Sequence, residues 1–275
     1  MAKPISAGFL RLRKCRVFYI VCAAAITICC ALVYSHLGDY EDYSASLRLC
    51  LFDHVPLIGL ICSVFIGLML GSEYSDGTMR NKLIVGHKRI SVYLSYVIVA
   101  AIGAVIVSAL CLLVTVALGL ALYKSLGIGV GACLWLCFCE LMIAAASAAG
   151  AALVVACTKS RSISAVMCII AFLALLFAGS YINGRLEEPE FVDYYMMTSE
   201  GGFPMEVQTS PNPRYVYGTE RTILELICEF DPAGQSILMS NFKATHPERL
   251  PLMSLLFITM TTAAGCAVFK KKDLV

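Results

Sequence analysis

Six long stretches of this 275-residue chain are almost free of charged side chains. They cover residues 17–35, 55–71, 91–122, 126–157, 163–182 and 250–269. A helix needs about 20 apolar residues to cross the hydrocarbon of a bilayer. Because lipid offers no hydrogen bonds, the backbone N–H and C=O groups of such a segment must pair within it, which favours a helix. We therefore predict an all-α membrane protein with six transmembrane helices in a single domain that covers 1–275.

Charged residues make up 15% of the chain, against about 25% in an ordinary soluble domain. If the N-terminus is cytoplasmic, 14 of the 21 basic residues lie on the cytoplasmic side and 15 of the 19 acidic residues lie outside. The cytoplasmic ones are Lys3, Arg11, Arg13, Lys14, Arg16, Arg80, Lys82, Lys88, Arg89, Lys159, Arg161, Lys270, Lys271 and Lys272. Since cytoplasmic loops are enriched in Lys and Arg, we expect both termini in the cytoplasm and the large loop 183–249, between helices five and six, on the outer side.

Most of the 14 cysteines fall inside the predicted spans, where they act as small apolar residues. The spacing of Cys133, Cys137 and Cys139 resembles a metal cluster, but a structural zinc site needs a fourth ligand and no histidine lies within a span. We therefore predict no bound metal. Cys50 and Cys228 fall on the outer side, where they are either two separate thiols or a disulfide.

Glu140 is the one ionisable residue in the middle of a predicted span. An ionised carboxylate there costs about 2.5–3.5 kcal/mol on insertion scales, so it must be protonated, paired or next to a wet cavity. Two interpretations stay open, a place in the substrate pathway and a structural hydrogen bond. The small residues 144–152 allow close approach of other helices and favour a central position for this span. The four histidines lie in loops or at span edges, which argues against a histidine-based proton relay.

The loop after the second span is basic and is punctuated by Gly77 and Gly86. Thr78 can cap a short helix in which Met79, Leu83 and Ile84 share one face while Arg80 and Lys82 face water. Such a helix would lie flat beneath the membrane. The alternative is a plain solvated loop.

The outer loop has two parts of different character. Residues 187–217 are rich in Pro, Glu and Tyr and show no clear period. From Thr219 onward an apolar stripe follows helical spacing, Asp231-Pro232 ends it, and a second apolar patch begins at Ile237. We expect two short helices here, which either dip into the outer leaflet or cap the ends of the spans.

Motifs for chemistry within this chain are missing from the sequence. It has no G-x-x-x-x-G-K-[ST] phosphate loop, no G-x-S-x-G elbow and no H-E-x-x-H pair. We therefore predict no catalytic residues and no cofactor bound by this chain. The acidic cluster of Glu187, Glu188 and Glu190 is interpreted as a solvated patch.

The loop after the second span also carries a family resemblance. Glu73, Gly77, Thr78 and Arg80 match an E-x3-G-T-x-[KR] pattern, which resembles the signature of ABC-2 type transporter permeases, especially those of bacterial drug- and bacteriocin-resistance exporters. The six spans, the basic N-terminal segment, the enlarged loop before the last span and the lysine-rich C-terminus are similar as well. No Asn-x-Ser/Thr sequon is present, which agrees with a bacterial plasma membrane protein.

The resemblance implies that two such permease subunits, identical or paralogous, pair in the lipid membrane. Two separate cytoplasmic subunits then bind ATP and magnesium and drive export of a hydrophobic or peptide-like substrate, and no nucleic acid is involved. The loop after span two would be the coupling helix. Its residues near the ATPase contact would be Glu73, Gly77, Thr78, Arg80, Lys82 and Arg89.

Two other classes of function stay open. An ion-coupled secondary transporter would use Glu140, although such proteins usually have more buried ionisable groups or broken helices. A membrane enzyme or non-transporting sensor subunit would depend on the acidic residues between Glu187 and Asp193.

Overall fold

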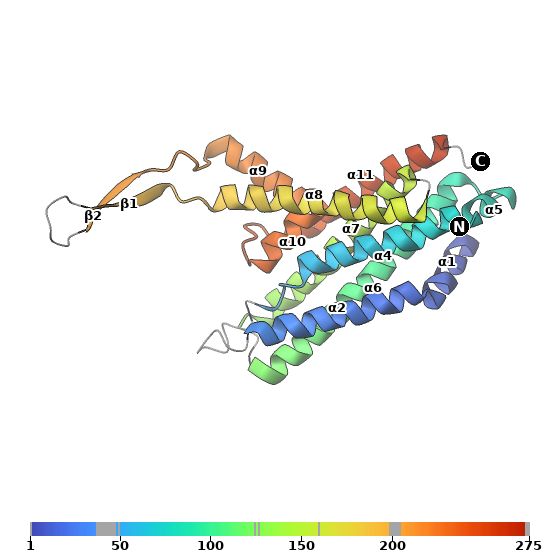
Figure 1. Ribbon diagram of the computed structural model, residues 1–275, viewed down its shortest axis with the longest axis horizontal. Coiled ribbons are helices and arrows are strands. Elements are labelled where there is room, and N and C mark those ends of the chain that lie inside the picture. Colours follow the sequence, from blue (N-terminus) through green and yellow to red (C-terminus); the bar gives the residue numbers. More distant parts are fainter. Residues whose placement is uncertain are drawn as a thin grey trace.

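The computed structural model describes residues 2–36, 48, 50–123, 125, 127–158, 160–197 and 205–272. The described chain is mostly helical, and six of its helices are long and apolar enough to cross a membrane. They are α2 (Arg16–Ser35), α4 (Val55–Ser75), α6 (Arg89–Tyr123), α7 (Val130–Cys157), α8 (Arg161–Glu187) and α11 (Leu250–Lys271). They run side by side as one elongated bundle (Figure 1). The prediction of a predominantly helical membrane protein with six such helices is confirmed.

Each predicted run overlaps one of these helices, with shifts at the ends. The helix α4 continues to Ser75, one turn beyond the predicted end, and that turn contains Glu73. The helix α7 begins at Val130 rather than at 126, because Gly127 has a positive φ of 69° and Gly129 is extended. Leu126, the predicted first residue, and Lys159 lie outside the described residues.

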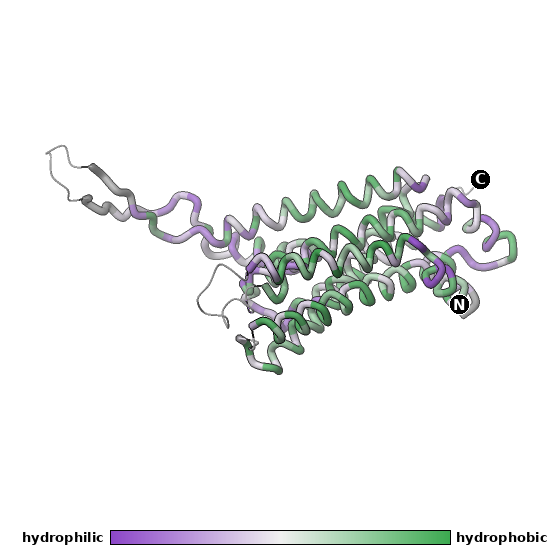
Figure 2. Tube along the Cα trace, turned by 60° about the horizontal axis from the view of Figure 1, so that its bottom comes forward, coloured by the Kyte–Doolittle hydropathy of each residue, from purple (hydrophilic) through white to green (hydrophobic). Residues whose placement is uncertain are grey.

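The two ends of the bundle differ (Figure 1). At one end lie α1 (Ala2–Lys14), the short helix α5 (Thr78–Ile84) and the C-terminal turn of α11. At the other end α8 leads into a hairpin of β1 (Phe191–Met197) and β2 (Met205–Pro211), followed by α9 (Gly218–Phe230) and α10 (Pro232–Ser240). We call these the α5 end and the hairpin end. Hydrophilic residues gather at both ends and hydrophobic residues line the helices between them (Figure 2).

The hairpin adds one short β element to this mostly helical fold and corrects the prediction that 187–217 is irregular. The strands β1 and β2 pair antiparallel, with Phe191 opposite Pro211. At the base, the backbone N–H of Asn212 donates to the carbonyl of Glu190 over 2.9 Å. A ribbon that projects away from the helices buries neither face against a core. Its sequence therefore needs no alternation of apolar and polar residues, which is the usual signal of a strand.

The helix α7 lies at the centre of the bundle, as its run of small residues predicts. Ala146, Ala148 and Ala149 have no exposed surface, and α7 packs against α4, α6, α8, α10 and α11. Another close approach joins α4 to α8, where a Cβ on Gly67 would lie 2.7 Å from the Cα of Ala165. Small side chains at these crossings let the helix backbones come together, which is the main source of helix packing in lipid.

Both predicted short helices of the outer segment are present, as α9 and α10. The helix α10 is buried between α4, α7 and α8, and a Cβ on Gly179 of α8 would lie 2.8 Å from the Cα of Gly234. The apolar stripe of α9 faces outward instead, with Ile223 and Ile227 about half exposed while Glu229 is buried. The stripe is therefore available to lipid, and the inward side of α9 is the more polar one.

Candidate functional site

The site predicted around Glu73 is built where α4 ends and α5 begins. The last turn of α4 leads to Asp76, and Gly77 then takes a left-handed conformation with φ of 65°. A residue with a side chain rarely adopts this φ, so glycine allows the tight change of direction. The new helix α5 starts at Thr78. The turn leaves the Glu73 carboxylate facing inward, with 3% of the residue exposed.

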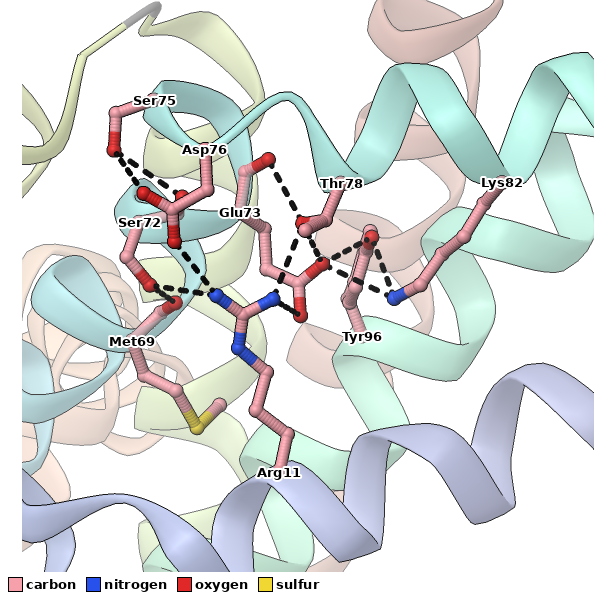
Figure 3. A network of polar contacts seen from close by, with 9 residues as sticks. All are labelled: Arg11, Met69, Ser72, Glu73, Ser75, Asp76, Thr78, Lys82 and Tyr96. Carbon is pink, nitrogen blue, oxygen red and sulfur yellow. Dashed lines mark hydrogen bonds and ion pairs between the residues drawn. The ribbon is translucent and has the colours of Figure 1, made fainter.

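Four side chains from three other elements surround this carboxylate (Figure 3). Oε1 pairs with Nη1 of Arg11 on α1 at 2.7 Å. Oε2 pairs with Nζ of Lys82 on α5 at 3.1 Å, and it accepts hydrogen bonds from the hydroxyls of Thr78 at 2.7 Å and Tyr96 at 3.0 Å. One buried group therefore connects α1, α4, α5 and α6.

The charges of this cluster balance. Arg11 also pairs with Asp76 through Nη2 at 3.0 Å, so two cations face two carboxylates. Glu73 is nearly inaccessible, whereas the side chains of Arg11 and Asp76 are 33% and 55% exposed. A buried carboxylate left without its partners is strongly destabilising, while an exposed pair contributes little. The Glu73 contacts are therefore the ones that hold these elements together.

The structure corrects three details of the predicted α5. Its N-cap is Gly77 rather than Thr78, whose hydroxyl donates to Glu73 instead. Met79 is buried as expected, but Ile84 is 72% exposed and does not share its inward face. Lys82 does not face water. Its ammonium points inward to Glu73 and lies 4.5 Å from the centre of the Tyr96 ring, because a buried carboxylate attracts the nearest flexible cation. Arg80 is exposed, as predicted.

Arg89, like Arg80, is a predicted loop residue that lies apart from the cluster. At the start of α6 its guanidinium donates to the carbonyls of Lys270 and Lys272, over 3.2 Å and 2.6 Å. These carbonyls belong to the last turn of α11 and its cap. The last carbonyl groups of a helix have no N–H partner within the helix, and the helix dipole favours a cation there. Arg89 therefore connects α6 to the C-terminus.

Two residues of the Glu73 cluster were not predicted from the sequence. The sequence predicts Arg11 only as one of the basic residues on the cytoplasmic side, and Tyr96 lies in the uncharged run 91–122, which is predicted to span the membrane. Arg11 stands on the basic face of the amphipathic α1 and Tyr96 is a polar tip within an apolar helix. Neither position signals a partner, because the contacts with Glu73 span 62 and 23 residues.

Glu140 forms a second buried polar cluster, between α4, α6 and α7. Its Oε1 lies 3.1 Å from Nε2 of His54 and accepts a hydrogen bond from the hydroxyl of Ser108 at 2.6 Å. His54 precedes α4 and is 1% exposed, as is Glu140. His54 lies at the edge of a span, as the sequence predicts, but its ring is buried against Glu140. The turn before α4 places this ring inside the bundle.

The Glu140 cluster is incompletely hydrogen-bonded. Oε2 of Glu140, Nδ1 of His54 and Oγ of Ser147 have no partner among the residues that the structure describes. A cavity of about 10 Å³ is lined by Glu140, Ser108, Ser147 and Ser236. That volume is enough for about one water molecule, which would have several polar neighbours there.

For the cysteines, the sequence leaves a disulfide between Cys50 and Cys228 open and predicts no metal site. Cys50 lies with Val33 and Tyr123, Cys228 lies against Gly179, and no disulfide joins these two described residues. Within the described ranges no three His, Cys, Asp or Glu side chains are placed to hold a metal ion.

Three acidic residues at the base of the hairpin have separate partners. Glu187 pairs with Lys243 at 2.7 Å, Glu188 accepts from Asn212 at 2.9 Å, and Asp193 accepts from Thr209 at 2.6 Å. These contacts hold the hairpin and its base in place.

No protein-family model matches the chain, and no curated protein matches it.

Proposed function

We propose that this chain is the membrane subunit of an ATP-driven exporter of the ABC-2 type. The observation that carries the proposal is the buried Glu73 carboxylate, which joins the short helix α5 to α1, α4 and α6. Three of the four residues of the E-x3-G-T-x-[KR] pattern, Glu73, Gly77 and Thr78, thus shape the turn and the cluster, while Arg80 faces solvent. Such a joint is what a separate motor subunit needs in order to move membrane helices.

Transmission of force follows from the energetics of the cluster. Moving α5 away from α4 would separate Lys82 and Thr78 from Glu73, and moving α1 would remove Arg11. Breaking a buried ion pair by removing one partner costs about 3–5 kcal/mol. A push on α5 is therefore transmitted to the ends of α4 and α6 rather than absorbed in the loop.

The exposed face of α5 is suited to docking a partner. Arg80 projects into solvent, and Ile84 and Val85 are 72% and 78% exposed beside it. We assign this α5 end to the cytoplasm, because Arg80, Arg89 and Lys270, which the sequence predicts inside the cell, lie there. Cytoplasmic ATP-binding subunits would bind this face. A second permease subunit would lie alongside in the bacterial plasma membrane.

The test uses variants of this exposed face, which leave the Glu73 cluster intact. Arg80→Glu and Ile84→Asp should abolish co-purification with the ATP-binding subunit and ATP-dependent transport, with unchanged membrane insertion. Glu220→Arg, an exposed charge reversal at the hairpin end, is the control and should behave as wild type. Full transport in both α5 variants would contradict the docking assignment. A gene for an ATP-binding subunit beside this one would support the proposal directly.

A second candidate, an ion-coupled transporter, is favoured by the Glu140 cluster alone. A carboxylate and an imidazole that face each other inside an apolar bundle can share and exchange a proton. In that case vesicles with a pH gradient and no ATPase should support transport, and Glu140→Gln should abolish it. Transport that needs the ATPase and ignores the gradient would exclude this candidate.

A further inference from the structure

A cavity of about 160 Å³ opens at the hairpin end, far from the Glu73 cluster. Its walls come from the last turn of α8, the inward side of α9, and the end of α10 with the residues that follow it. Three carboxylates, Glu187, Glu225 and Glu229, and two cations, Arg221 and Lys243, line it. Its volume is enough for a small organic group, whereas the cavity beside Glu140 holds about one water.

The two cations are already paired with two of the carboxylates. Lys243 lies 2.7 Å from Glu187, and Arg221 lies 3.1 Å from Glu225. Glu229 is left over. The residue is 4% exposed, and among the described residues its carboxylate has no ion pair and its Oε2 has no hydrogen-bond donor. The cavity thus has one carboxylate more than its cations can balance.

Glu229 is held in this position by its surroundings. The amide of Gln235 donates to the Glu229 carbonyl, and the neighbouring Cys228 has no exposed surface. A Cβ on Gly234 would lie 2.6 Å from the Cys228 carbonyl, so this part of α9 cannot rotate toward water without separating from α10. Burial raises the pKa of Glu229.

Four further charged groups act on the same carboxylate. Arg249 and His246 favour its ionised form, while Glu225 and Glu248 oppose it. Their effects have opposite signs, so they do not replace a direct partner. A buried carboxylate in this situation is either protonated or compensated by a bound cation.

We propose that this cavity binds a small primary alkylamine, with its ammonium group against Glu229. An ammonium group carries three donors, and the cavity offers it Glu229 together with the polar side chains of Asn183 and Thr245. Leu186 and Leu238 supply apolar wall for the alkyl stem. A metal ion is a poorer match, since the described part of the chain places no three suitable ligands together. This inference goes beyond the proposed function, because it needs neither ATP nor a partner subunit.

The experiment measures binding of n-butylammonium to the purified full-length protein in lipid nanodiscs, with 1-butanol as the uncharged analogue. Saturation-transfer NMR and the thermal unfolding midpoint are the readouts. Butylammonium should bind and raise the midpoint in a concentration-dependent way, and butanol should not. Glu229→Gln should weaken butylammonium binding about tenfold or more, while Glu220→Gln, which removes an exposed carboxylate outside the cavity lining, should leave it unchanged.

A converse variant separates binding from a purely structural role of Glu229. Lys243→Gln removes the ammonium that the chain itself supplies to Glu187, and it should therefore strengthen butylammonium binding severalfold. The proposal is overturned if butanol binds as well as butylammonium, or if Glu229→Gln binds butylammonium as wild type does. If Glu229→Gln does not fold, Lys243→Gln decides the question. Butylammonium binding to Lys243→Gln that is equal to or weaker than wild type would reject the proposal.

Discussion

At the residue scale, burial decides which charged side chains matter. Glu73 and Asp76 are three residues apart and both pair with Arg11, at 2.7 Å and 3.0 Å. Their surroundings differ, since the side chain of Glu73 is 4% exposed and that of Asp76 is 55% exposed. Water screens the Arg11–Asp76 pair and hydrates both charged groups when they separate. The buried Glu73 carboxylate cannot be hydrated in the same way if it separates from Arg11.

This difference predicts unequal effects of two matched substitutions. Glu73→Gln should lower the free energy of unfolding by about 1–3 kcal/mol, because Arg11 and Lys82 lose their common carboxylate but are themselves partly solvated. Asp76→Asn should change it by less than about 0.5 kcal/mol. Thermal unfolding in detergent measures both. Equal effects would show that the buried cluster does not hold the α5 end together.

Asp231 provides a pH test outside the membrane-spanning helices. Burial raises the pKa of this carboxyl to about 6, although it accepts the backbone N–H groups of Ala233 and Gly234 as the N-cap of α10. A folded-state pKa above the unfolded value of about 3.9 means that the fold prefers the protonated form. Stability should therefore fall as the pH rises from about 4 to about 6, by at most about 3 kcal/mol. In Asp231→Asn this slope should shrink, and the unfolding midpoint measured across that range is the check.

At the element scale, helix packing depends on where a side chain is absent. Gly67 of α4 and Gly184 of α8 are both helical glycines. A Cβ on Gly67 would meet the backbone of Ala165 at 2.7 Å, whereas a Cβ on Gly184 would have nothing within 4 Å. Gly67 therefore has no room for a side chain, whereas Gly184 has room for one. The amino-acid sequence alone does not show this difference.

Alanine at these two positions should act in opposite directions. Gly67→Ala should destabilise the protein by about 1–3 kcal/mol, because α4 and α8 must move apart. Gly184→Ala should stabilise it by up to about 1 kcal/mol through the higher helix propensity of alanine. Unfolding of the two variants, compared at the same detergent concentration, tests this. A stabilising Gly67→Ala would mean that the α4–α8 crossing is looser than described.

At the scale of the whole molecule, the long axis separates two polar ends. The α5 end holds both ends of the described chain and exposed basic residues such as Arg13, Arg80 and Lys88, and the hairpin end holds β1, β2 and α9 (Figures 1 and 2). A bundle of this kind can enter a membrane in one of two orientations. The distribution of Lys and Arg favours a cytoplasmic α5 end.

Labelling of single cysteines from outside intact cells tests this orientation. Cysteine introduced at Glu220 should react with a membrane-impermeant maleimide, and cysteine introduced at Arg80 should react only after the cells are opened. Cys157, which is exposed, is replaced by serine in both cases. Labelling of the Arg80 site in intact cells would reverse the proposed topology.

Sequence and structure agree best where one local property is sufficient. The uncharged runs predict the six long helices, because in lipid a backbone can satisfy its hydrogen bonds within a helix. The small residues of α7 predict its central place for a similar reason, since they permit close approach whatever the partner is. The loop pattern also places Glu73, Thr78 and Lys82 in one segment, although it misassigns the direction of Lys82.

What the tertiary structure alone decided is which distant residues meet. Arg11 and Tyr96 join Glu73, and His54 joins Glu140, through contacts 62, 23 and 86 residues apart along the chain. The pairing of β1 with β2 and the unpaired state of Glu229 were also decided only by the tertiary structure. Strand pairing and charge balance both depend on neighbours from other elements. Hydrophobicity is a property of each segment by itself, so the sequence determines the spans. A partner for a buried charge is a property of the packed bundle, so the sites were determined only when the helices came together.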